Sequence, residues 1–227
     1  MKTPLDIEEF LDQTFLGLDT LAMLGDIEDF ITFSEGNIEL QKQRELCRAT
    51  RESDEEHFDD QHFAAQYRAQ TIEGVAYRFD VSLTQRVRLA ALTSLITTIE
   101  WVLISLRNRA TFEIPNKPIG KNLAVHLIEV FNQQASLDLA PQIQLIETLT
   151  QVRNCIVHSA GLLASYKHGP ELRKRLSAFS GIKVSNINFL GDGIEIEQNY
   201  LQLVVKLAKD WLPSLERAMY EKDLLKN

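Results

Sequence analysis

Apolar residues recur every three or four positions along most of the chain, which is the spacing of amphipathic helices. In the first third this pattern predicts a helix from about Leu5 to Phe33, with Thr3-Pro4 suited to its first turn. Gly36-Asn37 is expected to end that helix. A second helix is expected from Ile38 to about Phe79, and its dense charges predict a solvated or protruding helix.

The middle of the chain is apolar on nearly all sides of a predicted helix, Thr84 to Arg109. Ser82 and Gln85 have the spacing of a capping box at its start. The 18 residues from Leu89 to Leu106 carry one charge, Glu100, and are just long enough to span a membrane. A carboxylate in mid-membrane is costly, so we expect a buried helix of a soluble protein and no membrane partner.

Proline, asparagine and glycine mark the predicted starts and ends of the remaining helices. The pattern predicts helices from about Asn122 to Gln134 and from Pro141 to near His158, the latter ended by Gly161. A short basic helix begins at Pro170, and an amphipathic helix from about Asn199 to Tyr220 closes the sequence. The expected fold class is therefore mainly α.

Between the last two helices the apolar period changes from that of a helix to that of a strand. Two strands are expected around a turn at Gly191-Asp192-Gly193. Their apolar positions are Ile182, Val184, Ile187, Phe189, Ile194 and Ile196. A phosphate-binding loop is the weaker interpretation of these glycines, because no helix begins directly after them. The mainly α fold should thus contain one short β-hairpin.

The formal charge of −8 conceals an uneven distribution. Residues 1–80 carry 7 basic and 19 acidic side chains, a net charge of −12, whereas residues 81–227 carry 17 basic and 13 acidic, a net charge of +4. We expect two parts, an acidic helical extension over 1–80 that packs on or protrudes from a bundle formed by 81–227. This distribution excludes a generally basic RNA-binding protein but not an enzyme that acts on RNA.

Cysteine usage and the first residues predict a cytoplasmic protein. Cys47 and Cys155 lie far apart, without the spacing of a metal site or a disulfide framework. The first residues, Met1-Lys2-Thr3-Pro4 followed by Asp6, Glu8 and Glu9, lack the basic start and apolar run of a signal peptide.

The helix from Pro141 carries three polar residues at the edge of its apolar face. Arg153 projects from inside the apolar stripe, so it needs a carboxylate, phosphate or carbonyl partner. Asn154 and His158 lie one turn apart on the same flank, where the amide could hold the imidazole. A structural reading is also open: Arg153 paired with a buried carboxylate, and His158 favoured by the helix dipole.

Glu100 is a candidate partner for Arg153. A lone carboxylate in the middle of an apolar helix requires compensation, as a lone arginine does. Arg86, Arg107 or a threonine hydroxyl are alternative partners for Glu100.

An arginine and a histidine suffice for one kind of RNA cleavage. Attack by the 2′-hydroxyl on the neighbouring phosphate needs a base, an acid for the 5′-oxygen and positive charge on the phosphorane. Histidine serves as base or acid near neutral pH, and arginine binds phosphate oxygens through its planar fork. One histidine cannot perform both proton transfers in a single step, so a second copy of the chain would be natural.

The stretch Arg153-Asn154-x-x-Val157-His158-x-x-Gly161 resembles the signature of HEPN domains, the higher-eukaryote and prokaryote nucleotide-binding domains. The preceding apolar helix with its lone acid and the following hairpin and helix also resemble these small helical bundles, over roughly residues 82–220. Residues 1–80 have no counterpart in the resemblance.

The resemblance implies a metal-independent endoribonuclease that acts as a homodimer with a composite site and needs no cofactor. Arg153 would then stabilise the scissile phosphate, His158 would be the acid/base group, and Asn154 would orient it. A toxin or phage-defence role with an antitoxin or regulatory protein as partner is also implied. Some HEPN domains are non-catalytic dimerisation or scaffold modules, which is the alternative function, and the overall acidity departs from strong RNA binding.

Basic residues that follow the motif are candidates for tracking the RNA backbone. They are Lys167, Arg173, Lys174 and Arg175. The alternative is that they only keep an exposed helix soluble. No metal site is expected, because His57, His62 and His126 lack the spacing of metal ligands.

Overall fold

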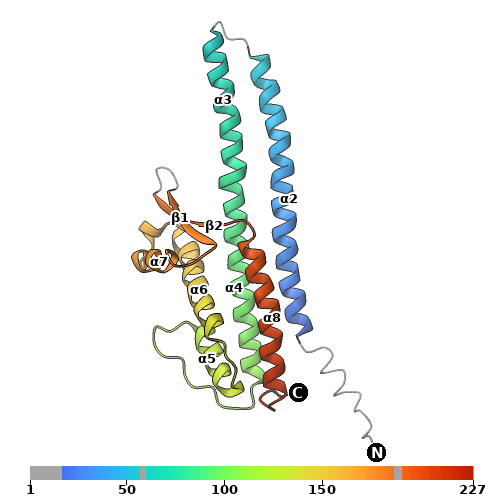
Figure 1. The fold of residues 1–227 in the computed structure, drawn as a ribbon, viewed down its shortest axis with the longest axis vertical. Coiled ribbons are helices and arrows are strands. Elements are labelled where there is room, and N and C mark those ends of the chain that lie inside the picture. Colours follow the sequence, from blue (N-terminus) through green and yellow to red (C-terminus); the bar gives the residue numbers. More distant parts are fainter. Residues whose placement is uncertain (1–16, 57–59, 187–190, 227) are drawn as a thin grey trace, which may run out of the picture. The chain divides into compact units, whose positions relative to one another are not determined.

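The computed structural model describes residues 17–56, 60–186 and 191–226, and these are mainly helical with a two-stranded antiparallel sheet (Figure 1). The helices are α2 (Leu18–Glu55), α3 (Gln61–Tyr77), α4 (Thr84–Arg109), α5 (Leu123–Ala135), α6 (Ala140–Ser159), α7 (Gly169–Leu176) and α8 (Tyr200–Tyr220). A π-helical turn, η1 (Arg78–Leu83), joins α3 to α4, and a 3₁₀ turn, η2 (Leu163–Ser165), precedes α7. The predicted mainly α class with one β-hairpin is confirmed.

The described residues form two compact units. Asp29–Ala91 form the first, which we call the hairpin unit, and the described residues up to Glu28 together with those from Leu92 onward form the second, the bundle unit. Their borders fall inside helices α2 and α4. These two units do not coincide with the division between residues 80 and 81 that the charge distribution suggests. That division stays a prediction.

In the hairpin unit, α2 and α3 run antiparallel beside each other (Figure 1). No side chain of α3, which is described throughout, is buried. Ion pairs cross between the two arms instead: Lys42 with Asp80 at 2.7 Å, and Arg68 with Asp54 at 2.9 Å. This confirms the expectation of a strongly solvated helical region.

The helix boundaries in this unit correct two predictions. Gly36-Asn37 does not end a helix, because α2 continues through it to Glu55. A single glycine costs a long helix only about 1 kcal/mol, which neighbouring residues offset. The break lies instead near Asp60, whose carboxylate caps α3 by accepting from the backbone N–H of His62 at 2.8 Å. The predicted start of the first helix, Thr3-Pro4, lies outside the described residues.

The predicted capping box at Ser82 is wrong, although the predicted bounds of α4 match. Helical backbone continues from α3 through η1 into α4, so no free N-terminus exists there to be capped. Thr84 Oγ1 donates to the Phe79 carbonyl at 2.7 Å and helps satisfy the wider turn. A serine–glutamine spacing therefore occurred by chance inside a continuous helix.

The core of the bundle unit is formed by α4, α5, α6 and α8, which lie side by side (Figure 1). Their fully buried side chains include Leu95, Ile99 and Leu103 of α4, Ile128 and Phe131 of α5, Ile146 and Leu149 of α6, and Val205 and Leu212 of α8. The start of α2 adds Leu24 and Ile27. The apolar stripes that predicted these helices thus face one another.

The elements after α4 match their predictions closely. Asn122 caps α5 by accepting from the Val125 N–H at 3.1 Å. Helix α6 ends at Ala160 and Gly161, both left-handed, with φ of 51° and 81°. Left-handed backbone after the last turn suits glycine and stops the helix at the predicted place.

The hairpin differs from its prediction in the position of the turn. Strand β1 (Ile182–Asn186) pairs antiparallel with β2 (Asp192–Ile196). Asp192 and Gly193 are part of the ladder, opposite Asn186 and Ser185, so the turn predicted at Gly191-Asp192-Gly193 is wrong. Ile187 and Phe189, expected in the first strand, lie outside the described residues.

Among the described residues, one continuous helix, Gln61–Arg109, is long and apolar enough to cross a membrane, and 44 % of its most apolar window is buried. Core helices of soluble proteins have the same length and composition. The expectations of no membrane partner and of a cytoplasmic location stay predictions.

Candidate functional site

Arg153 of α6 and Glu100 of α4 form an ion pair, with Arg153 Nη2 donating to Glu100 Oε1 at 2.5 Å. Each side chain is only 23 % exposed, so the pair is largely withdrawn from water. The Arg153 Nε is buried and has no hydrogen-bond partner among the described residues. The predicted partnership of Arg153 and Glu100 is therefore confirmed, in preference to Arg86, Arg107 or a threonine.

His158 lies in the last turn of α6, where its side chain is exposed. Within the described part of the chain, the Asn154 amide makes no hydrogen bond to this imidazole. The expected orienting contact is thus not made, and His158 is open to a ligand.

Arg153 and His158 leave α6 in different directions. A helix turns by about 100° per residue, so side chains five positions apart differ by about 140° around the axis. Arg153 is turned towards Glu100 of α4, whereas His158 is exposed. One copy of α6 therefore does not direct both groups at a single phosphate.

A cavity of about 730 Å³ lies against the flank of α6 that carries Asn154. Residues of the segment 117–122, of α5 and α6, and of the segment 166–171 line it, among them Gln151 and Asn154. This cavity was not predicted from the sequence. Glu147, Gln151, Asn154 and His158 form a polar stripe at helical spacing, which is the signal that could have indicated it.

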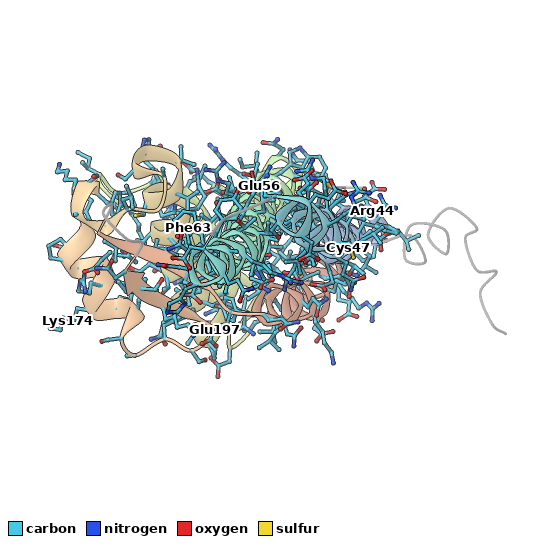
Figure 2. All side chains as sticks on the ribbon, turned by 90° about the horizontal axis from the view of Figure 1, so that it is seen from above. Arg44, Cys47, Glu56, Phe63, Lys174 and Glu197 are labelled. Carbon is cyan, nitrogen blue, oxygen red and sulfur yellow. The ribbon has the colours of Figure 1, made fainter. Side chains whose placement is uncertain are left out.

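The basic residues after the motif are partly neutralised by partners. Arg173 pairs with Asp192, and Arg175 Nη1 pairs with Glu147 Oε2 at 2.9 Å. Lys167 and Lys174 are exposed, and Lys174 lies at the outer edge of α7 (Figure 2). Of the four candidates for RNA binding, only these two lysines present a charge that is not held in an ion pair within the described residues.

The other histidines form no metal site in the described ranges, where no group of three or more His, Cys, Asp or Glu side chains has suitable placement. His126 is buried, and its Nε2 hydrogen-bonds the Pro115 carbonyl at 2.9 Å, which gives it a structural role. His57 lies outside the described residues.

The cysteines occupy contrasting environments. Cys155 of α6 is buried, and desolvation raises the pKa of its thiol to about 11. Cys47 is exposed and lies on the same side of α2 as Arg44 (Figure 2). A thiol with a raised pKa is a poor nucleophile, so Cys155 is part of the core rather than of the site.

Comparisons of the chain with protein-family models, curated proteins and solved structures find no match.

Proposed function

We propose that this protein is a metal-independent endoribonuclease of HEPN type that acts as a homodimer. The observation that carries the proposal is the arrangement around α6, in which Glu100 of α4 holds Arg153 in one orientation and His158 stays exposed one residue before the end of α6. These are the cation and the titratable group that 2′-hydroxyl transesterification needs.

The ion pair with Glu100 supplies preorganisation. A guanidinium has five N–H donors, and Glu100 Oε1 engages one amino group, Nη2. A partly buried, oriented cation stabilises developing charge on a phosphorane more strongly than a solvated one, because it does not reorganise during the reaction. In this proposal Glu100 is a positioning residue that acts through Arg153.

The proposed homodimer is inferred from the different directions in which the Arg153 and His158 side chains leave α6. Because Arg153 and His158 diverge around α6, the arginine of one protomer and the histidine of its partner would act on the same phosphate. Two exposed apolar residues support such a contact: Trp101, beside Glu100 in sequence, is 50 % exposed, and Val157, beside His158, is 57 % exposed. In the proposed dimer both side chains would lie at the contact and be withdrawn from water.

The test is cleavage of RNA in EDTA by the full-length protein and by single variants. Arg153→Ala and His158→Ala should each lower the cleavage rate at least about 100-fold, with the helical content unchanged. Arg107→Ala and His62→Ala are matched controls, since both side chains are exposed and outside the site. Full activity in either of the first two variants would refute the assigned roles.

The alternative is a non-catalytic dimerisation or scaffold module. It is favoured by the same ion pair, because Glu100 already satisfies the charge of Arg153 without any phosphate. This alternative predicts a dimer that leaves RNA uncut from pH 6 to 9. A regulatory protein or antitoxin, and a toxin or phage-defence role, belong to the proposal only as the contexts in which such a nuclease is expected.

A further inference from the structure

The cavity beside Asn154 is suited to a ligand by size and position. At about 730 Å³ it lies within the range of small-molecule sites, and it lies entirely in the bundle unit. Asn154 is part of both the cavity wall and the α6 motif. His158 lies one helical turn beyond Asn154 on the same polar stripe. The proposed RNA cleavage would therefore take place next to the cavity.

Most of the charges on the cavity wall are held in ion pairs. Two of the three lining carboxylates have a basic partner, Glu129 with Lys121 and Glu147 with Arg175, and the third, Glu171, lies 3.4 Å from the His168 imidazole. Lys117 Nζ, the remaining charged group, donates to the carbonyl of Lys121 at 2.6 Å. With Lys117 and Glu171 of opposite sign and the other carboxylates in ion pairs, the wall favours a neutral ligand over a highly charged one.

Polar groups on α6 are left for such a ligand. Thr150 is 2 % exposed, and its Oγ1 has no hydrogen-bond partner in the part of the chain that the structure describes. Because this oxygen is out of reach of solvent, Thr150 forms part of the wall without offering the cavity a hydrogen bond. Gln151 and Asn154 add two amides, which can donate and accept, and neither is hydrogen-bonded to another described side chain.

An aromatic ring completes the site. Tyr166 lines the cavity and meets His168 edge-on, with ring centroids 5.8 Å apart. Burial raises the pKa of Tyr166 above its ordinary value, so its hydroxyl stays a donor at neutral pH. A phenol ring next to amides is the combination with which proteins stack an unpaired base and hydrogen-bond its edge.

We propose that this cavity binds one unpaired nucleobase of the RNA substrate and so sets the sequence preference of cleavage, with Gln151 and Tyr166 as specificity-determining residues. The proposal rests on the proposed function, since it names the part of the substrate that lies beside the cleaved bond. The amides of Gln151 and Asn154 hydrogen-bond the base edge, and Tyr166 contacts its face. Lys117, in the same wall, binds a neighbouring phosphate.

The test measures binding apart from cleavage. Fluorescent 2′-O-methyl tetranucleotides of A, C, G and U cannot be cut through a 2′-hydroxyl, and fluorescence anisotropy gives their affinities for the full-length protein. One base should bind about tenfold more tightly than the others, and Gln151→Ala and Tyr166→Ala should each abolish most of this preference. Gln144→Ala is the matched control, being an exposed amide of α6 outside the cavity.

The outcomes separate this inference from the ribonuclease proposal. Equal affinity for the four bases, or a preference that survives in both cavity variants, overturns the base site even if ordinary RNA is cut. A preference that depends on Gln151 and Tyr166 supports the base site, and failure to cut ordinary RNA would then overturn only the nuclease. Unfolding curves of each variant confirm that the fold is retained.

Discussion

At the scale of single residues, the Glu100–Arg153 pair ties the candidate site to the stability of the bundle unit. Replacing Glu100 by Gln leaves a largely buried guanidinium without its counter-charge, so the free energy of unfolding should fall by about 1–3 kcal/mol. Urea unfolding measures this loss. Glu113→Gln is the control, since Glu113 is exposed and lies outside the pair. Equal losses in the two variants would contradict the role given to the pair.

Cys155 gives a prediction about pH. Burial raises its pKa to about 11 from the ordinary value of 9.0, so the unfolded thiol ionises first as the pH rises. The stability that the protonated thiol contributes is complete below pH 9 and is lost between pH 9 and 11. Cys155→Ala should therefore show a smaller fall in unfolding free energy over this range than the natural chain. Parallel curves for the two proteins would count against burial of the thiol.

Sequence reasoning found the Arg153 partner because a charge inside an apolar stripe demands compensation, and Glu100 was the lone acid of the most apolar helix. It did not find the cavity. Lys117, Gln151 and Tyr166 come from three separate segments of the chain. No local sequence pattern predicts that these segments lie next to one another in the fold. The hydrogen bond expected between the Asn154 amide and the His158 imidazole is not formed. A spacing of four residues brings two side chains to the same side of a helix, but it does not by itself orient them for a hydrogen bond.

At the scale of elements, Gly36 of α2 allows a direct test of why no helix ends at Gly36-Asn37, where the sequence predicted an end. A Cβ at Gly36 would meet nothing within 4 Å, so Gly36→Ala should raise the free energy of unfolding by up to about 1 kcal/mol through helix propensity. Gly181 is the contrasting case, with φ of 88° and a Cβ that would overlap the Tyr200 ring. Gly181→Ala should destabilise the chain in the same thermal melts. A loss of stability in Gly36→Ala would argue that α2 does break there.

Elements were predictable where local signals and tertiary packing agree. Asn122 and Pro141 mark helix starts and Gly161 marks a helix end that the structure also uses, because a side-chain cap, a proline in the first turn and left-handed backbone suit those positions. In the hairpin unit the local signals at Gly36 and Ser82 are overridden, since each lies inside helical backbone whose N–H and C=O groups are already paired. The β-hairpin was found from its apolar period, but its turn was misplaced because glycine is tolerated in a ladder near its end.

At the scale of the whole molecule, the proposed dimer depends on the exposed apolar residues next to the site. Trp101→Glu and Val157→Glu should shift the protein from dimer to monomer in sedimentation velocity and lower RNA cleavage in parallel, because a buried charge at the contact would be unpaired. Leu203→Glu is the matched control, as Leu203 of α8 is 53 % exposed and lies outside the α6 motif. A dimer unaffected by both site-adjacent changes would place the contact elsewhere.

The uneven distribution of charge along the whole chain affects how strongly the protein should bind RNA. The net charge of −12 over residues 1–80 accounts for the acidity of the whole protein, while residues 81–227, which hold the motif, are net positive. Since Arg173 and Arg175 are paired, the positive charge available to RNA near the motif is modest. Weak, selective binding through a base site is therefore expected, rather than strong binding along the backbone, and affinity should fall only slightly as salt rises.

The most direct measurement is the chemistry of the RNA ends that the purified full-length protein produces in EDTA. The account predicts 2′,3′-cyclic phosphate and 5′-hydroxyl ends, and no cutting where the nucleotide on the 5′ side of the cleaved bond is replaced by its 2′-deoxy form. Ends that carry a 5′-phosphate, cleavage that survives the 2′-deoxy replacement, or intact RNA throughout pH 6 to 9 would contradict it.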